Sequence, residues 1–246
     1  MSTRQFLIFI DLFLSSVAWA QKDITTVGFQ IKPTFTSSFI GTGPQNINDS
    51  SFNYSIKPGS GYVAGMVIRK GYTPSLSIEF GLNYAVRNMT ISASNGIELA
   101  DNKLRIVGYE IPFSQLIFIR LSNTIYMNAG AGACLNMFPS DVFKRDSTFS
   151  AYGSRSLQFN PSLLANIGFE FRSNKSGYFY LGASLNRPFS EIYQFKFNYL
   201  NQGILQNAAF GKLNGAYLAL DFKYFFHEDP EKKKKRLEKK QNSSQN

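Results

Sequence analysis

Cysteine and histidine are almost absent from this chain of 246 residues, which contains one of each, Cys134 and His227. A single cysteine excludes an intramolecular disulfide framework and a zinc site built from several cysteines. A single histidine excludes histidine-rich metal sites. His227 follows the last expected strand, so it cannot serve as the base for a serine nucleophile at the outer end of that strand region. We therefore expect neither a metal nor another cofactor, and we expect the chain not to be an enzyme.

Charged residues are also scarce, at 17% of the chain against roughly 25% in typical globular domains. Aromatic residues reach 15%, there are 19 glycines, and the hydrophobic fraction of 43% is too high for a disordered chain. This composition is typical of a sheet protein whose outer surface does not face water.

Long hydrophobic runs are missing after residue 20, where no segment approaches the roughly 18 apolar residues that a membrane-spanning helix requires. Before that point, Arg4, an apolar stretch at 6–17 and the sequence Ala18-Trp19-Ala20 predict a signal peptide over residues 1–20. Asp11 interrupts the apolar stretch, and the alternative is a buried N-terminal helix. An exported chain without spanning helices can enter a membrane only as a closed barrel, because an open sheet leaves unpaired backbone groups in lipid.

Eight segments, each about 9 to 15 residues long, alternate apolar residues with small or polar ones, and this period of two predicts strands. The segments are 24–36, 61–69, 76–87, 105–118, 124–137, 158–172, 177–186 and 216–226. The clearest is 76–87, in which Leu76, Ile78 and Phe80 alternate with Ser77 and Glu79. Strands of this length match a tilted strand that crosses a bilayer.

The connections between the segments alternate in length. Those at 70–74, 119–123 and 173–176 are short, whereas those at 37–60, 92–103, 138–157 and 187–215 are long and polar. Bacterial outer-membrane barrels have short periplasmic turns and long external loops. The sequence therefore predicts an all-β fold, an eight-stranded antiparallel transmembrane up-and-down β-barrel over residues 21–226, in contact with the lipid of the cell outer membrane.

The polar positions of the expected strands indicate which face points inward. They contain many Gly, Ser and Asn residues and charges of both signs, which suits a narrow lumen where opposite charges pair. The alternative is a soluble carrier barrel, with its apolar face inside. We predict structural lumen ion pairs, not catalytic groups, among Lys32, Arg69, Glu79, Arg87, Glu110, Glu170, Arg172, Asp221 and Lys223.

Two motifs stand out in neighbouring segments: VGYEIPF at residues 107–113 and YMNAGAG at residues 126–132. Together with EFGLNY at residues 79–84, they resemble the PorT-like family of small outer-membrane barrels of the Bacteroidota, over roughly residues 24–226. The resemblance implies a small outer-membrane barrel and, through the member that names the family, a part in type IX secretion. Family chains tend to finish at the last strand, whereas twenty residues follow Phe226 here.

Those last residues, 227–246, form a compositional break, with seven Lys or Arg and four Asp or Glu that supply +3 of the net charge of +10. One interpretation is a solvated, partly helical or disordered tail. The other is a basic periplasmic segment that contacts anionic lipid or a protein through Lys232, Lys233, Lys234, Lys235 and Arg236. Export removes the chain from nucleic acid, so we expect no nucleic-acid partner.

Two functions remain open. The first is a non-enzymatic barrel with a structural or accessory role in secretion or surface assembly, which acts on a periplasmic or outer-membrane protein partner. Its predicted contact surface is formed by the long loops, with Tyr193, Phe195, Phe197 and Tyr199. The second is a narrow conduit or a small-ligand-binding barrel, which requires an open lumen.

Overall fold

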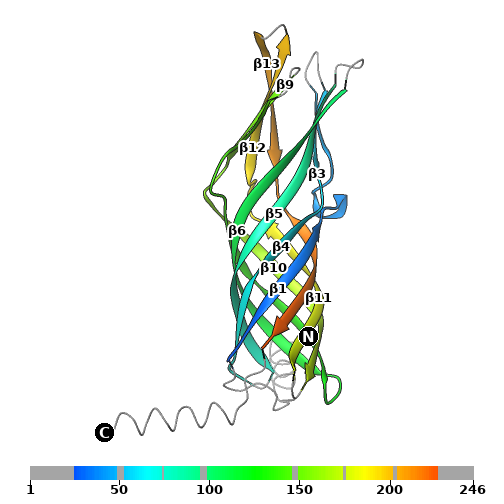
Figure 1. Ribbon diagram of the computed structural model, residues 1–246, viewed down its shortest axis with the longest axis vertical. Helices are drawn as coiled ribbons and strands as arrows, with labels where there is room; N and C mark the ends of the chain where they lie inside the picture. Colours follow the sequence, from blue (N-terminus) through cyan, green and yellow to red (C-terminus); the bar gives the residue numbers. More distant parts are fainter. Residues whose placement is uncertain are drawn as a thin grey trace, which may run out of the picture.

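In the computed structural model, the chain forms a tall antiparallel barrel that continues at one end into a second β-structured part, the extension (Figure 1). The structure describes residues 25–48, 53–73, 75–94, 99–145, 149–173, 176–201 and 204–226. The predicted signal peptide at 1–20 and the basic tail at 227–246, including the five basic residues 232–236, lie outside these described residues.

Eight strands form the barrel: β1 (Thr25–Phe35), β4 (Gly61–Gly71), β5 (Leu76–Ser94), β6 (Leu99–Arg120), β7 (Ile125–Met137), β10 (Phe159–Ser173), β11 (Gly177–Pro188) and β14 (Tyr217–Phe225). Each pairs antiparallel with its neighbours in this order, and β1 pairs with β14 to close the ring. The closed ring removes the free sheet edges that a membrane does not tolerate. The predicted fold class is confirmed, and every predicted segment is a barrel strand.

The barrel wall is apolar outside and polar inside. Along β14, Leu218, Leu220 and Phe222 are exposed, whereas Ala219, Asp221 and Lys223, which alternate with them, are buried. The other barrel strands repeat this alternation, and their exposed rings and aliphatic side chains form an outer belt. A soluble carrier barrel has its apolar side chains inside and its polar side chains outside, so this wall has the arrangement of a membrane barrel.

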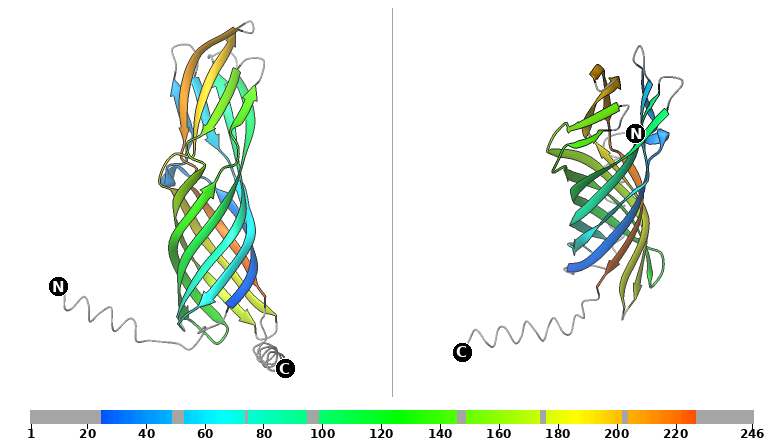
Figure 2. Two further views of the ribbon diagram at one scale, coloured as in Figure 1. Left: turned by 90° about the vertical axis from the view of Figure 1, so that its left-hand side faces the viewer. Right: turned by 45° about the horizontal axis from the view of Figure 1, so that its top comes forward.

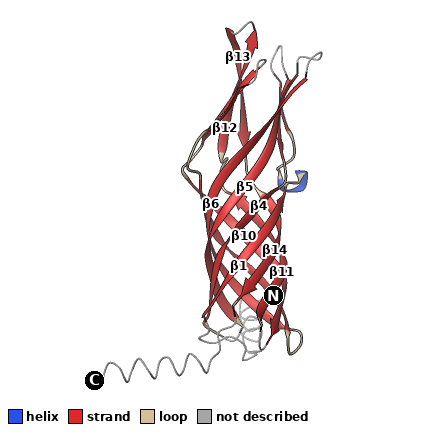
Figure 3. Cartoon of the chain, in the orientation of Figure 1, coloured by secondary structure: helices blue, strands red, loops and turns tan. Residues whose placement is uncertain are grey.

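Helical structure is nearly missing from the described residues, which contain one short 3-10 helix, η1 (Ser38–Ile40), beside the rim of the barrel (Figure 3). In this part of the chain, no helix is long and apolar enough to cross a membrane.

The extension contains six further strands, β2 (Gln45–Asn48), β3 (Asn53–Pro58), β8 (Val142–Arg145), β9 (Phe149–Arg155), β12 (Tyr193–Asn201) and β13 (Ile204–Leu213). Strands β2 and β3 join the far ends of β5 and β6 in one sheet, and the order β13-β12-β9-β8 forms the other (Figure 2). The prediction of four polar loops at 37–60, 92–103, 138–157 and 187–215 is therefore wrong, because each of them contains strand residues. Their short alternating stretches are set among Asn, Ser and Gly residues, which mask the period of two.

A hydrophobic core fills the space between the two sheets of the extension. Tyr54 on β3 stacks on Phe197 on β12, with 5.2 Å between ring centroids, and Phe197 stacks in turn on Phe195 at 6.0 Å. The predicted contact surface is wrong for Tyr193, Phe195 and Phe197, which are fully buried in this core. Their alternation puts all three on one face of β12, and the other sheet covers that face. The side chain of Tyr199 lies outside the described part.

Candidate functional site

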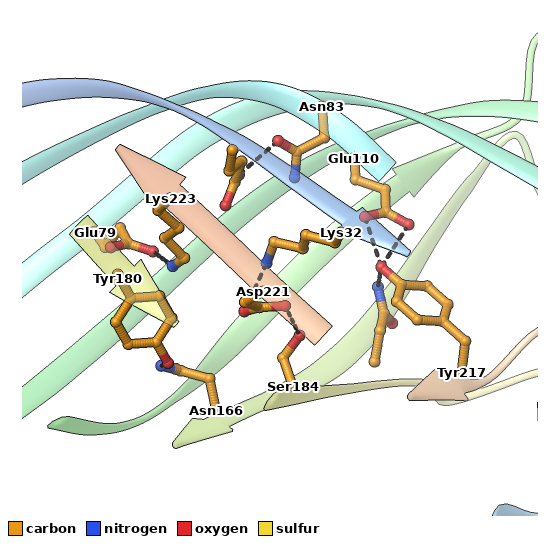
Figure 4. Close-up of polar contacts among 12 residues, drawn as sticks. Lys32, Glu79, Asn83, Glu110, Asn166, Tyr180, Ser184, Tyr217, Asp221 and Lys223 are labelled. Atoms are coloured by element: carbon orange, nitrogen blue, oxygen red, sulfur yellow. Dashed lines mark hydrogen bonds and ion pairs between the residues drawn. The ribbon is translucent and has the colours of Figure 1, made fainter. Parts of the chain in front are cut away.

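The lumen of the barrel is the candidate site, because strand alternation points the charged positions of the wall into it. The structure places the nine predicted residues there on six strands and joins all of them in ion pairs. Five of these residues are cationic and four are anionic, so the lumen is close to neutral. Figure 4 shows part of this network.

The largest cluster lies toward the end of the barrel away from the extension. Arg69 on β4 is fully buried between two carboxylates, with 3.0 Å from its Nη2 to Glu79 Oε2 and an Nη1 hydrogen bond to Glu170. Arg172 Nε donates to Glu170 at 2.7 Å, and Lys223 donates to Glu79. Each carboxylate thus bridges two cations, which compensates for the loss of water around buried charges.

Aromatic rings hold the two guanidinium groups of this cluster. The Arg69 guanidinium lies 3.9 Å from the centre of the Phe225 ring, and that of Arg172 lies 3.7 Å from the centre of the Tyr126 ring. Such cation–π contacts are stronger where water is excluded. The end of the lumen is therefore packed by rings as well as by charges.

The middle of the lumen contains an ion pair between Lys32 and Asp221, at 3.2 Å, with a hydrogen bond of 2.7 Å from Ser184 Oγ to Asp221 Oδ1 (Figure 4). Beside it, the Gln30 amide donates to Asn83 Oδ1 at 2.6 Å. The amide contact connects β1 with β5, and Asp221 connects β14 with its neighbours β1 and β11.

The ring of Tyr180 fills space that two glycines leave free. Gly168 on β10 and Gly182 on β11 face each other in register, and a side chain at Gly182 would collide with the Tyr180 hydroxyl. Asn166 donates to that hydroxyl at 3.3 Å, and the Lys223 ammonium lies 5.0 Å from the ring centre. The glycines are thus required by a close approach inside the lumen.

A second cluster closes the lumen where the barrel meets the extension. Glu110 on β6 accepts a hydrogen bond of 2.9 Å from Arg87 Nη2 and one of 2.8 Å from the Tyr217 hydroxyl. Asn186 donates to Tyr217 at 3.3 Å. Strand alternation assigns Tyr217 to the inward face, but no signal in the sequence joins it to Glu110, which lies 107 positions away.

Little space is left between these side chains. A cavity of about 20 Å³ is lined by Lys32, Glu79, Asp221 and Lys223, and a cavity of about 30 Å³ lies beside Arg87 and Tyr217 under the extension. A buried water needs about 10 to 15 Å³ measured in this way, so each cavity has room for one or two waters. At these two places in the described part of the chain, the side chains pack too closely to leave a wide water-filled path.

The chemistry available in this lumen is set by the contacts that its ionisable side chains make. Each of the four carboxylates contacts a cation, which holds it as a structural anion. Cys134 is buried on the inward face of β7. The described residues contain no group of three or more His, Cys, Asp or Glu side chains placed to hold a metal ion.

Comparisons with known proteins identify the architecture. No family model matches the chain, and no curated protein does. The solved structure of the outer membrane protein OprG from Pseudomonas aeruginosa matches it with a TM-score of 0.52 and 13% identity, over 85% of this chain and 98% of OprG. The outer membrane protease OmpT from Escherichia coli gives a TM-score of only 0.29, at 9% identity over 86% and 97% of the two chains, which is too low to support an argument. The match to OprG and the closed strand ring together show that this chain has the fold of an outer-membrane β-barrel.

Proposed function

We propose that this protein is a non-enzymatic outer-membrane barrel that acts as a closed membrane anchor for its extension, in a structural or accessory role. Two features of the wall support its place in a membrane. The ring of strands has no free edge, and its outer belt is apolar while its charges lie inside. In water this belt would be a large exposed hydrophobic surface, which soluble monomers avoid.

The lengths of the connections support an orientation. At the end away from the extension, β4 connects to β5 and β6 to β7 through tight turns, in which Tyr72 and Leu121 donate backbone hydrogen bonds. Short turns of outer-membrane barrels face the periplasm. We therefore place the extension outside the cell, and the start of β1 and the end of β14 on the periplasmic side.

The packed lumen is the observation that carries the proposal. A conduit, the alternative function, requires a water-filled path past Arg69, Glu110 and Asp221, which are all buried. Arg69 and Glu110 are bonded across the lumen to Glu170 and Tyr217, and Asp221 is ion-paired with Lys32 on the neighbouring strand. Single-channel recording in planar bilayers distinguishes the two functions. A closed anchor gives no steady current, and a conduit gives a defined conductance.

The motif resemblance supports a finer assignment to the PorT-like barrels of the Bacteroidota and to secretion or surface assembly. The two motifs lie on the paired strands β6 and β7, where Ser114, the residue after the first motif, is opposite Gly132, the last residue of the second. Glu110, the carboxylate of the first motif, accepts hydrogen bonds from Arg87 and Tyr217, which is a structural task. The motif therefore supports a shared barrel construction more directly than a shared partner.

Partner capture tests the accessory role. Outer membranes are crosslinked, and the full chain is purified in parallel with a variant that ends at Pro230 and lacks the basic residues 232–236. If the tail docks on a periplasmic partner, that partner is captured with the full chain alone. Recovery of the same partner with both chains assigns the contact to the barrel or the extension, and recovery of none contradicts the accessory role.

A further inference from the structure

Four exposed side chains form a row across the outer face of the sheet β13-β12-β9-β8. Phe143 on β8 is opposite Tyr152 on β9, Tyr152 is opposite Lys196 on β12, and Lys196 is opposite Phe210 on β13. Directly opposed residues of antiparallel strands share a face. The three rings are 61%, 43% and 70% exposed, and we name these four residues the outer row.

Positive charge accompanies the outer row. Arg145 and Lys212 lie on the same face, each two residues along the strand from Phe143 or Phe210. Glu191 is 3.7 Å from Lys212, and Asp141 is 3.5 Å from Arg155 and accepts a hydrogen bond from the Tyr152 hydroxyl, so these two carboxylates near the face already have partners. Among the described residues, Lys196 and Arg145 have no carboxylate within ion-pair distance, so both cations are available to an anionic ligand.

The other sheet of the extension provides a contrast. Its exposed side chains are polar or charged, such as Asn53, Lys57, Asp101 and Lys103, and its described residues include no exposed large hydrophobic side chain. The outer row belongs to the extension and not to the barrel wall, so lipid contact of the wall does not account for its rings. Exposed aromatic residues gathered on one face mark an interaction surface.

We propose that the outer row binds an anionic polysaccharide outside the cell, an inference that rests on the proposed orientation of the extension. Lys196 separates Tyr152 from Phe210, so the face offers no continuous apolar area for a protein core or an acyl chain. The flat rings on both sides of Lys196 instead stack on the apolar faces of successive sugars, and Lys196 and Arg145 pair with the carboxylate or phosphate groups of these sugars. With neighbouring strands about 4.8 Å apart, the row spans about 14 Å, enough for several sugar units.

Calorimetric titration of the full chain in zwitterionic nanodiscs tests this proposal, with polygalacturonate fragments as the probe. We expect saturable binding that weakens with salt, and about tenfold weaker binding for Phe210→Ala and for Lys196→Ala. Tyr152→Phe keeps the ring and is expected to keep the affinity. Phe39→Ala removes an exposed ring from η1, and Lys103→Ala removes an exposed cation from the other sheet; neither is expected to change binding.

Several results would overturn the inference. The first is the absence of saturable binding by the unaltered chain. The second is binding of neutral dextran, or of poly-glutamate, as tight as that of polygalacturonate; the poly-glutamate result would indicate an acidic protein partner. The third is a loss of affinity in the two control variants as large as that in Phe210→Ala and Lys196→Ala. Each variant is checked for the heat-dependent gel shift of a folded barrel. All substituted side chains are exposed, so we expect each variant to fold. The comparison of polygalacturonate, dextran and poly-glutamate uses the unaltered chain and does not depend on any variant. A steady current in planar bilayers would contradict the closed anchor and leave this binding result unaffected.

Discussion

Lys32 and Asp221 form an ion pair of 3.2 Å at the seam where the first and last barrel strands meet. The paired positions of β1 and β14 run from Gly28 opposite Phe225 to Ile31 opposite Phe222 and resume at Thr34 opposite Ala219. The interruption contains Pro33, which has no amide hydrogen to donate to the neighbouring strand. The side-chain ion pair therefore links the two strands where the backbone ladder is broken.

Removal of one partner of this seam pair is expected to destabilise the barrel. Asp221→Asn leaves the Lys32 ammonium largely buried without a counter-charge, which typically costs about 3 to 5 kcal/mol. The double variant Lys32→Met, Asp221→Leu removes both charges and should regain most of the loss. Urea unfolding followed by the gel shift measures both, with Lys103→Met as a surface control. Equal stability of Asp221→Asn and the unaltered chain would contradict a role for the pair in closing the seam.

Tyr217 is expected to stabilise the lumen through its hydroxyl group. Tyr217→Phe keeps the ring but removes a donor to the buried Glu110, and a loss of about 1 to 3 kcal/mol follows from leaving that carboxylate short of one partner. Tyr84→Phe, at an outward-facing position of β5, serves as the matched control. If the two variants unfold at the same urea concentration, the hydrogen bond does not contribute.

The contact between β8 and β9 should depend on pH through Asp141. The hydrogen bond from Tyr152 and that from the Arg155 amide hold the pKa of Asp141 below its ordinary value. Because the pKa of Asp141 is lower in the folded than in the unfolded state, the contact stabilises the fold fully at pH values above the ordinary pKa of about 4. This stabilisation is lost as the pH falls through the lower pKa of the folded state.

Hydrogen exchange at the Arg155 amide, measured against pH and corrected for intrinsic exchange, monitors this contact. Protection should fall at acidic pH in the unaltered chain. Tyr152→Phe should move this fall to higher pH, because the largest cause of the depressed pKa is removed. Asp141→Asn should abolish the pH response, and a response that persists in this variant would assign it to another group.

The core of the extension should unfold separately from the barrel. Phe197→Ala removes a fully buried ring that stacks on Tyr54 and Phe195, and such a cavity typically costs about 3 to 5 kcal/mol. Limited proteolysis should cut the extension of this variant while the barrel keeps its gel shift. Phe210→Ala, on the exposed face of the neighbouring strand, should remain resistant. Loss of the gel shift in Phe197→Ala would show that the barrel depends on the extension.

The sequence predicts the barrel well because two signals agree. Residues 76–87 show the clearest alternation, and the short connections mark where one strand ends and the next begins. The inward positions of Glu110 and Tyr217 also follow from alternation. Their contact does not, because it depends on the stagger between β6 and β14 on opposite sides of a closed ring.

The extension shows what alternation leaves out. Phe195 and Phe197 have the same period as the outward residues of β14, yet the first two lie in a protein core and the others on the outer belt. A period of two identifies a face and not what covers it. The covering sheet is built from β2 and β3, whose alternating stretches of four and six residues are too short to distinguish from polar loops.

The most direct test of the closed anchor is single-channel recording of the refolded full chain in planar bilayers. The ion-paired lumen, in which the cavities beside Asp221 and Tyr217 measure only about 20 and 30 Å³, predicts insertion without a steady conductance, at either sign of voltage and at high salt. Insertion is verified by recovering the protein from the same bilayers in its heat-shiftable form. A reproducible, saturable single-channel current from this material would show that the ion-paired lumen opens, and it would contradict the account.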